Sequence, residues 1–382
     1  MMPRGDRGRR LEGAGCDRAA ENASFLVDAV VIGRNEGVRL IRCLDSMKRA
    51  DLRRIVYVDS GSTDGSIAEA ESRGVEVLRL DLSVPFTAAR ARNAGLDRLR
   101  RQGGVRADLV QFIDGDCELD PGWIGRARAF LQANPGVAGT GGRCRERFPG
   151  ASVYNRFCDR EWDTPVGEAR ALGGNAMFRM AALDQVGGFD PALIAGEEPE
   201  LCVRLRARGW TIRRIDGEMV LHDAAMTRFG QFWKRARRAG FAFAQGYAMH
   251  GAAPERHYAA PLRRAILWGA VLPAAAFLGA VAIHPVFLAL LLLWPAQILR
   301  LWRRDGDGPP TSSTREQRRR GRECGIGHLP VRDRHEPVLR QPRTGGVGAR
   351  GGHGRPHDRD PHGEPAALDD VQLARARHRR HR

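Results

Sequence analysis

Two aspartates separated by one residue, Asp114 and Asp116, directly follow the apolar run VQFI. Such a run is typical of a buried strand, so both carboxylates leave one strand end and can reach the same hard cation. Mg²⁺ and Mn²⁺ prefer oxygen ligands of this kind and share them with phosphate groups. The pair therefore predicts a divalent-metal site that could neutralise a diphosphate leaving group. Two solvated loop aspartates are the alternative interpretation.

Polar side chains also follow two earlier strand-like runs. Asn35 and Glu36 come after VDAVVIG, and Asp59 closes the run IVYVD. In open parallel sheets, ligands bind at the carboxyl ends of the strands. We therefore expect these loops to converge beside Asp114 and Asp116. Turn formation alone does not explain so many carboxylates at strand ends.

The elements that must hold these groups are visible in the hydrophobic pattern of residues 25–258. Apolar runs predict strands, and the amphipathic stretches between them predict helices. Alternation of this kind is typical of an α/β fold with a mostly parallel sheet and helices on both faces. The predicted strands are residues 27–33, 55–59, 75–80 and 110–114, and the predicted helices are residues 38–49, 66–72 and 87–101.

Composition excludes several other classes. The chain has 382 residues and a formal charge of +17, yet Lys48 and Lys234 are its only lysines and neither follows a glycine, so it contains no G-x-x-x-x-G-K-[ST] phosphate loop. The seven cysteines form no C-x-x-C pair, which argues against a zinc site or a disulfide framework and fits a reducing compartment. Residues 1–24 lack an apolar stretch, so we expect a disordered N-terminus without a secretory signal, followed by a cytoplasmic domain.

Residues 263–302 form a hydrophobic segment. Residues 265–302 contain no charged side chain before Arg300. About 20 residues cross a bilayer as a helix, so the segment fits two short transmembrane helices broken near His284 and Pro285, or one helix followed by a re-entrant piece. Arginines at both ends favour a hairpin with both ends in the cytoplasm. A buried helix pair of a soluble domain is the alternative.

The last segment, residues 303–382, has no aromatic residue and is rich in Arg, Gly and His. Such a composition cannot build a core, so we expect low-complexity disorder. A basic arm for nucleic acid or anionic lipid is an alternative, but the absence of interleaved aromatic residues argues against nucleic-acid binding. The residues are those that GC-rich codons give out of frame, which indicates a frameshifted tail.

Seven stretches of the globular part together resemble a family 2 glycosyltransferase of the membrane-associated bacterial type. They follow that family's order across residues 27–245 and are VVIGRNE, VDSGSTDGS, ARNAGL, FIDGDCEL, GGNAMFR, VGGFD and GEEPELCVRLRARGW. The resemblance implies the GT-A fold, a Rossmann-like sheet flanked by helices. It also implies a nucleoside-diphosphate sugar as donor and Mg²⁺ or Mn²⁺ as cofactor.

The resemblance assigns roles to the matching positions. Asp116 is expected to hold the metal and the diphosphate. His222 resembles a histidine that can join the metal in this family, and a half-buried histidine at a strand end is the alternative. The residues expected to bind the donor are Asn35, Glu36, Asp59, Arg92, Asn93, Asp114, Gly174 and Asn175.

The family's catalytic base is expected in a motif written Glu-Asp-x-Asp or Glu-Asp-x-Glu, where this chain has Glu197-Glu198-Pro199-Glu200. An inverting transfer needs one carboxylate to remove the proton from the acceptor hydroxyl. The Glu-for-Asp change moves a carboxylate by one methylene and leaves Glu197 and Glu198 as candidates, of which Glu198 is favoured. The same residues also suit the first turn of a helix, where acids complement the dipole and proline fits.

These features predict a metal-dependent inverting glycosyltransferase at the cytoplasmic face of the plasma membrane. Its expected acceptor is lipid-linked or a saccharide, in cell-surface polysaccharide or glycolipid synthesis. Residues 231–238 depart from the Q-x-x-R-W pattern of processive synthases and predict an interfacial helix with Phe229, Phe232 and Trp233 toward lipid. The alternatives are a nucleotidyltransferase of related fold and a non-catalytic membrane protein with a basic tail.

Overall fold

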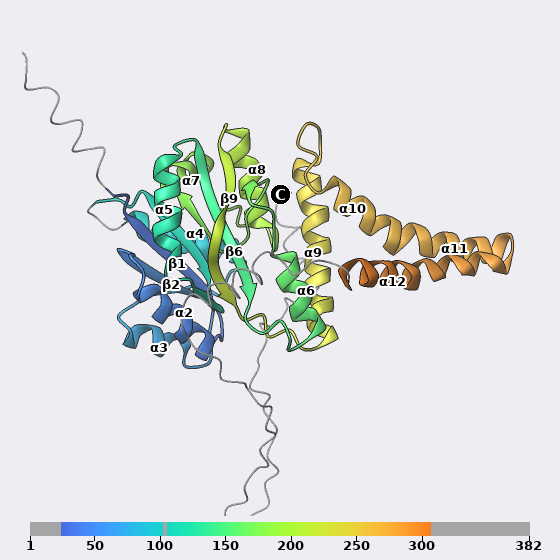
Figure 1. The fold of residues 1–382 in the computed structure, drawn as a ribbon, viewed down its shortest axis with the longest axis horizontal. Coiled ribbons are helices and arrows are strands. Elements are labelled where there is room, and N and C mark those ends of the chain that lie inside the picture. The colour runs from blue at the N-terminus through green and yellow to red at the C-terminus, as the bar shows by residue number, and fades with distance from the viewer. Residues whose placement is uncertain (1–23, 102–104, 307–382) are drawn as a thin grey trace, which may run out of the picture. The chain divides into compact units, whose positions relative to one another are not determined.

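The computed structural model describes residues 24–101 and 105–306, which are drawn as ribbons in Figure 1. The described chain forms two compact units, one up to Arg263 and one from Arg264 onward. The disorder predicted for residues 1–24 and the frameshifted tail predicted for residues 303–382 fall almost entirely outside the described residues.

The first unit is built on one sheet with the strand order β3-β2-β1-β4-β8-β6-β9-β5, and β7 pairs with β9. The half from β3 to β4 is parallel throughout, as the alternation of strands and helices predicts. The strands are β1 (Val27–Gly33), β2 (Arg54–Asp59), β3 (Glu76–Arg79), β4 (Leu109–Asp114), β5 (Cys117–Leu119), β6 (Val137–Glu146), β7 (Gly167–Glu168), β8 (Ala176–Arg179) and β9 (Thr211–His222).

Antiparallel pairs enter in the other half, so the sheet is mixed. β8 runs antiparallel to both β4 and β6, and β5 runs antiparallel to β9, whereas β6 and β9 are parallel. The sequence predicted a mostly parallel sheet because β5, β7 and β8 are only two to four residues long. A strand that short carries too few residues for a period-two pattern to be recognised.

Helices cover both faces of this sheet and make two cores. Ala29 and Val31 of β1 enter one core with α2 and α5, whereas Val30 and Ile32 enter the other with α4, α7 and α8, because successive strand residues point to opposite faces. The helices of this unit are α2 (Val38–Lys48), α3 (Ser66–Ser72), α4 (Ala88–Arg101), α5 (Trp123–Ala133), α6 (Val153–Glu161), α7 (Met180–Val186), α8 (Glu197–Ala207) and α9 (Phe229–His250).

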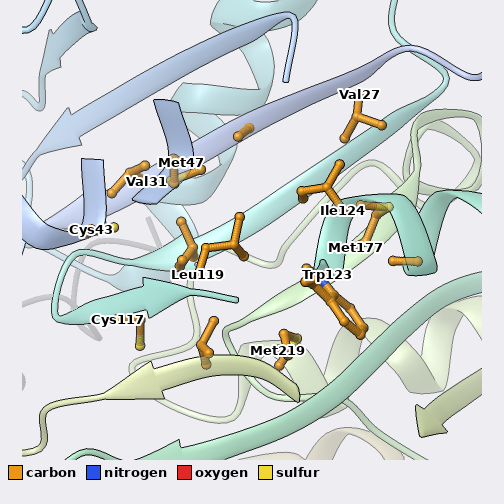
Figure 2. Close-up of a cluster of buried hydrophobic side chains, with 14 of the residues drawn as sticks. Val27, Val31, Cys43, Met47, Cys117, Leu119, Trp123, Ile124, Met177 and Met219 are labelled. Carbon is orange, nitrogen blue, oxygen red and sulfur yellow. The ribbon is translucent and has the colours of Figure 1, made fainter. Parts of the chain in front are cut away.

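The first core surrounds a buried tryptophan. Figure 2 shows Trp123 at the start of α5 beside Met177 of β8 and Met219 of β9. The Trp123 indole donates a 2.7 Å hydrogen bond to the side chain of buried Gln111 on β4. This bond satisfies the polar atom of a fully buried ring and ties α5 to the strand that leads to Asp114.

The second unit is helical and apolar. Its chain breaks at His284, where Pro285 lacks the amide needed to continue the helix. A Cβ at Gly279 would lie 2.3 Å from the Phe287 ring, so the chain after the break packs closely against the helix before it. The helix Ala259–Ala282 is long and apolar enough to cross a membrane. The elements, with α10 leading in from the first unit, are α10 (Ala259–Ile266), η1 (Leu267–Val271), α11 (Leu272–Ala282), η2 (Pro285–Leu292) and α12 (Leu293–Gly306).

Candidate active site

The strand ends that carry the predicted donor residues are neighbours. β1 lies between β2 and β4, and the register pairs Gly33 with Asp59 and Ile32 with Asp114. The loops that follow these three parallel strands therefore leave the sheet at the same edge, which is where open α/β sheets bind ligands.

The loops after β1 and β2 are tied together by side chains. Asn35 has φ 56°, in the left-handed region that asparagine tolerates. Its amide donates to Ser62 Oγ at 2.9 Å, and its Oδ1 accepts from the Thr63 amide at 2.7 Å. The buried Asp59 carboxylate accepts three hydrogen bonds, all from residues 57–62. Asn35 and Asp59, which were predicted to bind the sugar donor, therefore hold these two loops in shape.

Asp116 and His222 meet at the predicted metal position. Asp116 lies between β4 and β5, and His222 ends β9, where the register sets it opposite Cys117. His222 Nε2 lies 3.3 Å from Asp116 Oδ2. Burial on its own lowers the pKa of His222, but the Asp116 carboxylate outweighs burial and raises that pKa to about 9. Burial likewise opposes ionisation of Asp116, and His222 overcomes it and lowers the pKa of Asp116.

These residues fit a divalent cation. One ligand atom each from Asp116, Cys117 and His222 lie within 4.8 Å of one another. The buried Nδ1 of His222 has no hydrogen-bond partner among the described residues. Cys117 accepts a hydrogen bond from Asn175 Nδ2 at 3.4 Å, and burial raises the pKa of its thiol well above the usual range. Asp116 and His222 are therefore the candidate ligands, a donor set that suits Mn²⁺ because a bound cation would displace the proton of the imidazole.

Arg92 of α4 connects the end of strand β4, next to the predicted metal position, to helix α8. Its side chain is 3% exposed, and Nη2 donates to Asp114 Oδ1 at 2.9 Å. Nη1 donates to Glu197 Oε1 at 2.7 Å and lies 2.9 Å from Glu198 Oε1. Burial lowers the pKa of Arg92, but the three carboxylates outweigh burial and raise it. The residue predicted to bind the donor thus holds a charged cluster together.

The two glutamates at the start of α8 differ in their surroundings. The Glu197 side chain is 7% exposed and the Glu198 side chain is 15% exposed. Burial and the neighbouring Glu197 raise the pKa of Glu198 to about 7, and Arg92 opposes this rise. A carboxylate with a pKa near 7 is suited to remove a proton at neutral pH.

The acidic first turn of α8 also has the structural role predicted for it. The helix begins after Gly196, whose φ of 81° favours glycine, and its first turn carries Glu197, Glu198 and Glu200. Glu200 does not join the cluster around Arg92. It accepts from Arg204 at 2.8 Å and lies 3.0 Å from His250 Nε2, so it ties α8 to α9.

The Gly174-Asn175 segment lies against the cluster. A Cβ at Gly174 would lie 2.4 Å from Arg92 Nη2 and 2.8 Å from Asp114 Oδ2, so only glycine leaves room for this contact. Asn175 Oδ1 accepts from the Asp114 amide at 3.0 Å. The segment therefore supports Asp114, where the sequence predicted contacts with the donor.

The two remaining predicted donor residues also have protein partners. Asn93 donates to the Phe189 carbonyl at 2.7 Å and accepts from the Phe189 amide at 2.9 Å, which holds the turn before α8. Glu36 pairs with Arg39 at 2.7 Å. Burial, and then the charge of Asp116, raise the pKa of Glu36 to about 7. Glu36 is therefore coupled electrostatically to the metal position.

Two residues that lie around His222, Trp162 and Asp223, were given no role from the sequence. The Trp162 ring meets the His222 ring edge to face, with centroids 4.5 Å apart. Asp223 accepts from Arg42 at 2.9 Å, and its carbonyl accepts from Arg39 at 3.3 Å. These contacts join residues far apart in the chain, and no motif marks any of them.

Comparison with known proteins identifies the class that this fold and site define. The sequence matches Glycosyl transferase family 2 over residues 28–187 and Glycosyl transferase family group 2 over residues 113–302. The two matches overlap on the segment that carries Asp114 and Asp116. The chain therefore belongs to the family 2 glycosyltransferases.

Individual relatives are more distant. The chain is similar to the pre-mycofactocin glycosyltransferase of Mycobacterium tuberculosis, with 27% identity over 213 residues that cover 52% of this chain and 42% of the relative. Human polypeptide N-acetylgalactosaminyltransferase 15 is 34% identical over 89 residues, 21% of this chain and 12% of the relative. The chain thus spans less than half the length of these curated relatives.

A solved structure has the same fold. The mannosyltransferase PcManGT from Pyrobaculum calidifontis, in complex with GDP-Man and Mn²⁺, superposes with a TM-score of 0.52 at 22% identity, covering 74% of this chain and 84% of that one. The GT-A α/β fold predicted from the sequence is confirmed.

Proposed function

We propose that the first unit transfers a sugar, with inversion, from a nucleoside-diphosphate donor to an acceptor hydroxyl, with Glu198 as the base. The linked cluster of Asp114, Arg92 and Glu198 carries this proposal. At one end of the cluster is a partly exposed carboxylate with a pKa of about 7. At the other, two residues beyond Asp114, Asp116 begins the candidate metal site.

In this mechanism Glu198 removes the proton of the acceptor hydroxyl as the acceptor oxygen bonds to the anomeric carbon. The bond from that carbon to the diphosphate oxygen breaks, and its electron pair leaves with the nucleoside diphosphate. Attack from the opposite face inverts the configuration, and the proton ends on Glu198. A divalent cation at Asp116 and His222 would supply charge neutralisation for the diphosphate. Glu197 positions Arg92 and does not touch the reacting atoms.

The donor is assigned to the edge of the sheet where the loops of β1, β2 and β4 meet. Asn35 and Asp59 rigidify the first two of these loops, which leaves their backbone in a fixed shape for a nucleotide. The ligands bound by PcManGT, GDP-Man and Mn²⁺, support a nucleoside-diphosphate sugar and a divalent metal for this chain as well.

The proposed acceptor lies in a membrane, and the reaction takes place at the cytoplasmic face of the plasma membrane. The proposed role is cell-surface polysaccharide or glycolipid synthesis. Support comes from the length and apolar composition of the helix Ala259–Ala282. The hydrophobic segment also has arginines at both ends, Arg263 and Arg264 at one and Arg300 and Arg303 at the other. A lipid-linked or saccharide hydroxyl is the preferred acceptor. The name of the Mycobacterium tuberculosis relative supports pre-mycofactocin as a second candidate.

The test is product analysis with the full chain, Mn²⁺ and a panel of UDP-, GDP- and dTDP-sugars. The proposal expects release of a nucleoside diphosphate and a product whose anomeric configuration, measured by NMR, is opposite to that of the donor. Polyprenyl phosphate, saccharides and pre-mycofactocin serve as acceptors, and Glu198→Gln is the matched inactive control. Released pyrophosphate would instead assign a nucleotidyltransferase, and a product of retained configuration would remove the role of Glu198.

A further inference from the structure

Helix α9 is basic along its first half. Its 22 residues include Lys234, Arg235, Arg237 and Arg238 and no aspartate or glutamate. Lys234, Arg237 and Arg238 are exposed, whereas Arg235 pairs with Glu161 of α6 at 2.9 Å. The helix therefore presents basic side chains on the surface of the catalytic unit and contains no acidic residue.

An apolar stripe runs along the outer side of the same helix. Its members follow one another at spacings of three and four residues, which places them on one side of an α-helix. They are Phe229, Trp233, Ala236, Gly240, Ala244 and Tyr247, all exposed apart from the half-buried Gly240. Phe229 is 62% exposed and Trp233 is 56% exposed. The buried residues Ala242 and Gly246 lie on the opposite side, which packs on the protein.

The rotation of α9 is set by Phe232, which points inward. Its ring stacks on Tyr154 at 5.3 Å and meets the edge of Phe157 at 5.8 Å, both on α6, which lies beside α9 in Figure 1. The sequence prediction that Phe232 faces lipid is therefore wrong. With Phe232 held by α6, Phe229 and Trp233 are directed outward.

We propose that the α9 stripe, with the exposed Arg237 at its edge, lies on the headgroup region of an anionic lipid bilayer. Aromatic and apolar side chains on one side of a helix, flanked by Lys and Arg, are the pattern of helices that lie in the membrane interface. The Arg237 cation selects for anionic headgroups. The inference rests on the membrane location proposed above and adds a second contact, made by the catalytic unit itself.

This contact would orient α8, the helix that carries the proposed base Glu198. The last residue of α9, His250, lies 3.0 Å from Glu200, two residues after Glu198 on α8. A bilayer that holds α9 in its interface therefore holds the base at a fixed height above the lipid surface.

The experiment uses tryptophan emission of the full chain reconstituted in vesicles of phosphatidylcholine and phosphatidylglycerol, with and without brominated acyl chains. The emission lost in Trp233→Phe isolates Trp233, and Trp210→Phe isolates a half-buried tryptophan of the same unit that donates to Gln185 at 2.9 Å. Trp294→Phe reports on the hydrophobic segment. We expect brominated lipid to quench most of the Trp233 and Trp294 emission and to leave the Trp210 emission unchanged.

The second part of the experiment weakens the charge attraction between α9 and the lipid. Arg237→Gln should reduce the quenching of Trp233, as should roughly 1 M salt, at which charges are screened beyond about 3 Å. Quenching of Trp294 without quenching of Trp233 overturns the α9 contact and leaves the membrane location standing. Quenching of neither overturns both. A Trp233 emission that shifts with protein concentration and not with lipid assigns the surface to a second copy of the chain.

Discussion

The Glu198 carboxylate lies 2.9 Å from the guanidinium of Arg92, and the same guanidinium binds Asp114. One buried cation therefore couples the first turn of α8 to the strand that ends beside the metal position. Because α4 and α8 both pack on the second core, this coupling is held by the fold as well as by charge.

Replacing Glu198 by glutamine should greatly slow turnover while donor binding remains. The amide keeps the size of the side chain but cannot accept the acceptor's proton, and general base catalysis contributes about 10²–10⁴-fold to rate. We expect kcat to fall by that factor with little change in the donor dissociation constant, measured by calorimetry. Glu197→Gln is the matched control and should cost far less. The reverse order would make Glu197 the base.

The pH dependence should show the ionisation of Glu198. Its pKa of about 7 means that the base is ready only above neutrality, so kcat/KM should rise with pH and level off above about 7. The effect on stability has the opposite sign. Folding raises this pKa from 4.5, so the contribution of Glu198 favours the folded state below pH 4.5 and is lost as the pH rises toward 7.

Replacing Arg92 tests the origin of that pKa. Arg92 opposes the effect of burial on Glu198, so a variant that loses its contact should move the acid limb of the pH profile upward. Arg92→Lys keeps a charge near the three carboxylates, whereas Arg92→Met leaves them without a partner and should cost about 3–5 kcal/mol of stability. The measurements are the pH profile and thermal unfolding of both variants, and the shift of the profile should be larger in Arg92→Met. An unshifted profile would separate the base from Arg92.

The parts of the fold that were predictable have long, strongly patterned elements. The predicted ranges for β1 and α3 agree with the structure, and those for β2, β4, α2 and α4 differ by one residue at an end. Strand β6 was not predicted, because its sequence VAGTGGRCRE is rich in glycine and charge and lacks period-two alternation. Its pairing with β8 and β9 supplies what local propensity does not.

The site was predictable in a different way. Adjacent strand ends brought Asp59 and Asp114 to one edge through the general rule for parallel sheets. The contact of Arg92 with Glu198 joins residues too distant in the chain for spacing to predict, and only the family resemblance placed both near the donor. The internal hydrogen bonds of Asp59, Asn93 and Asn175 were invisible, because a polar side chain that faces a ligand and one that supports a loop have the same sequence.

A methyl group at position 174 should disrupt the cluster. In Gly174→Ala the Cβ would lie 2.4 Å from Arg92 Nη2 and 3.1 Å from Glu198 Oε1, so the guanidinium must move away from its carboxylates. We expect a loss of activity of at least about tenfold, since overpacking a buried site costs about 1–3 kcal/mol. Gly173→Ala is the matched control, because a Cβ there has nothing within 4 Å. Equal activity of the two variants would contradict the tight contact at Gly174.

Removing a metal ligand should remove the stabilisation that Mn²⁺ confers. A cation that binds only the folded state at about 100 times its dissociation constant raises stability by about 2.7 kcal/mol. Asp116→Asn and His222→Gln should each lose most of the Mn²⁺-dependent rise in unfolding temperature, since both side chains contribute to the same small cluster. Cys117→Ser is the control from that cluster and should keep the rise, because burial keeps the thiol of Cys117 protonated. If the serine variant alone lost its response to Mn²⁺, the ligand would be the thiol, and the site would suit a softer ion than the one proposed.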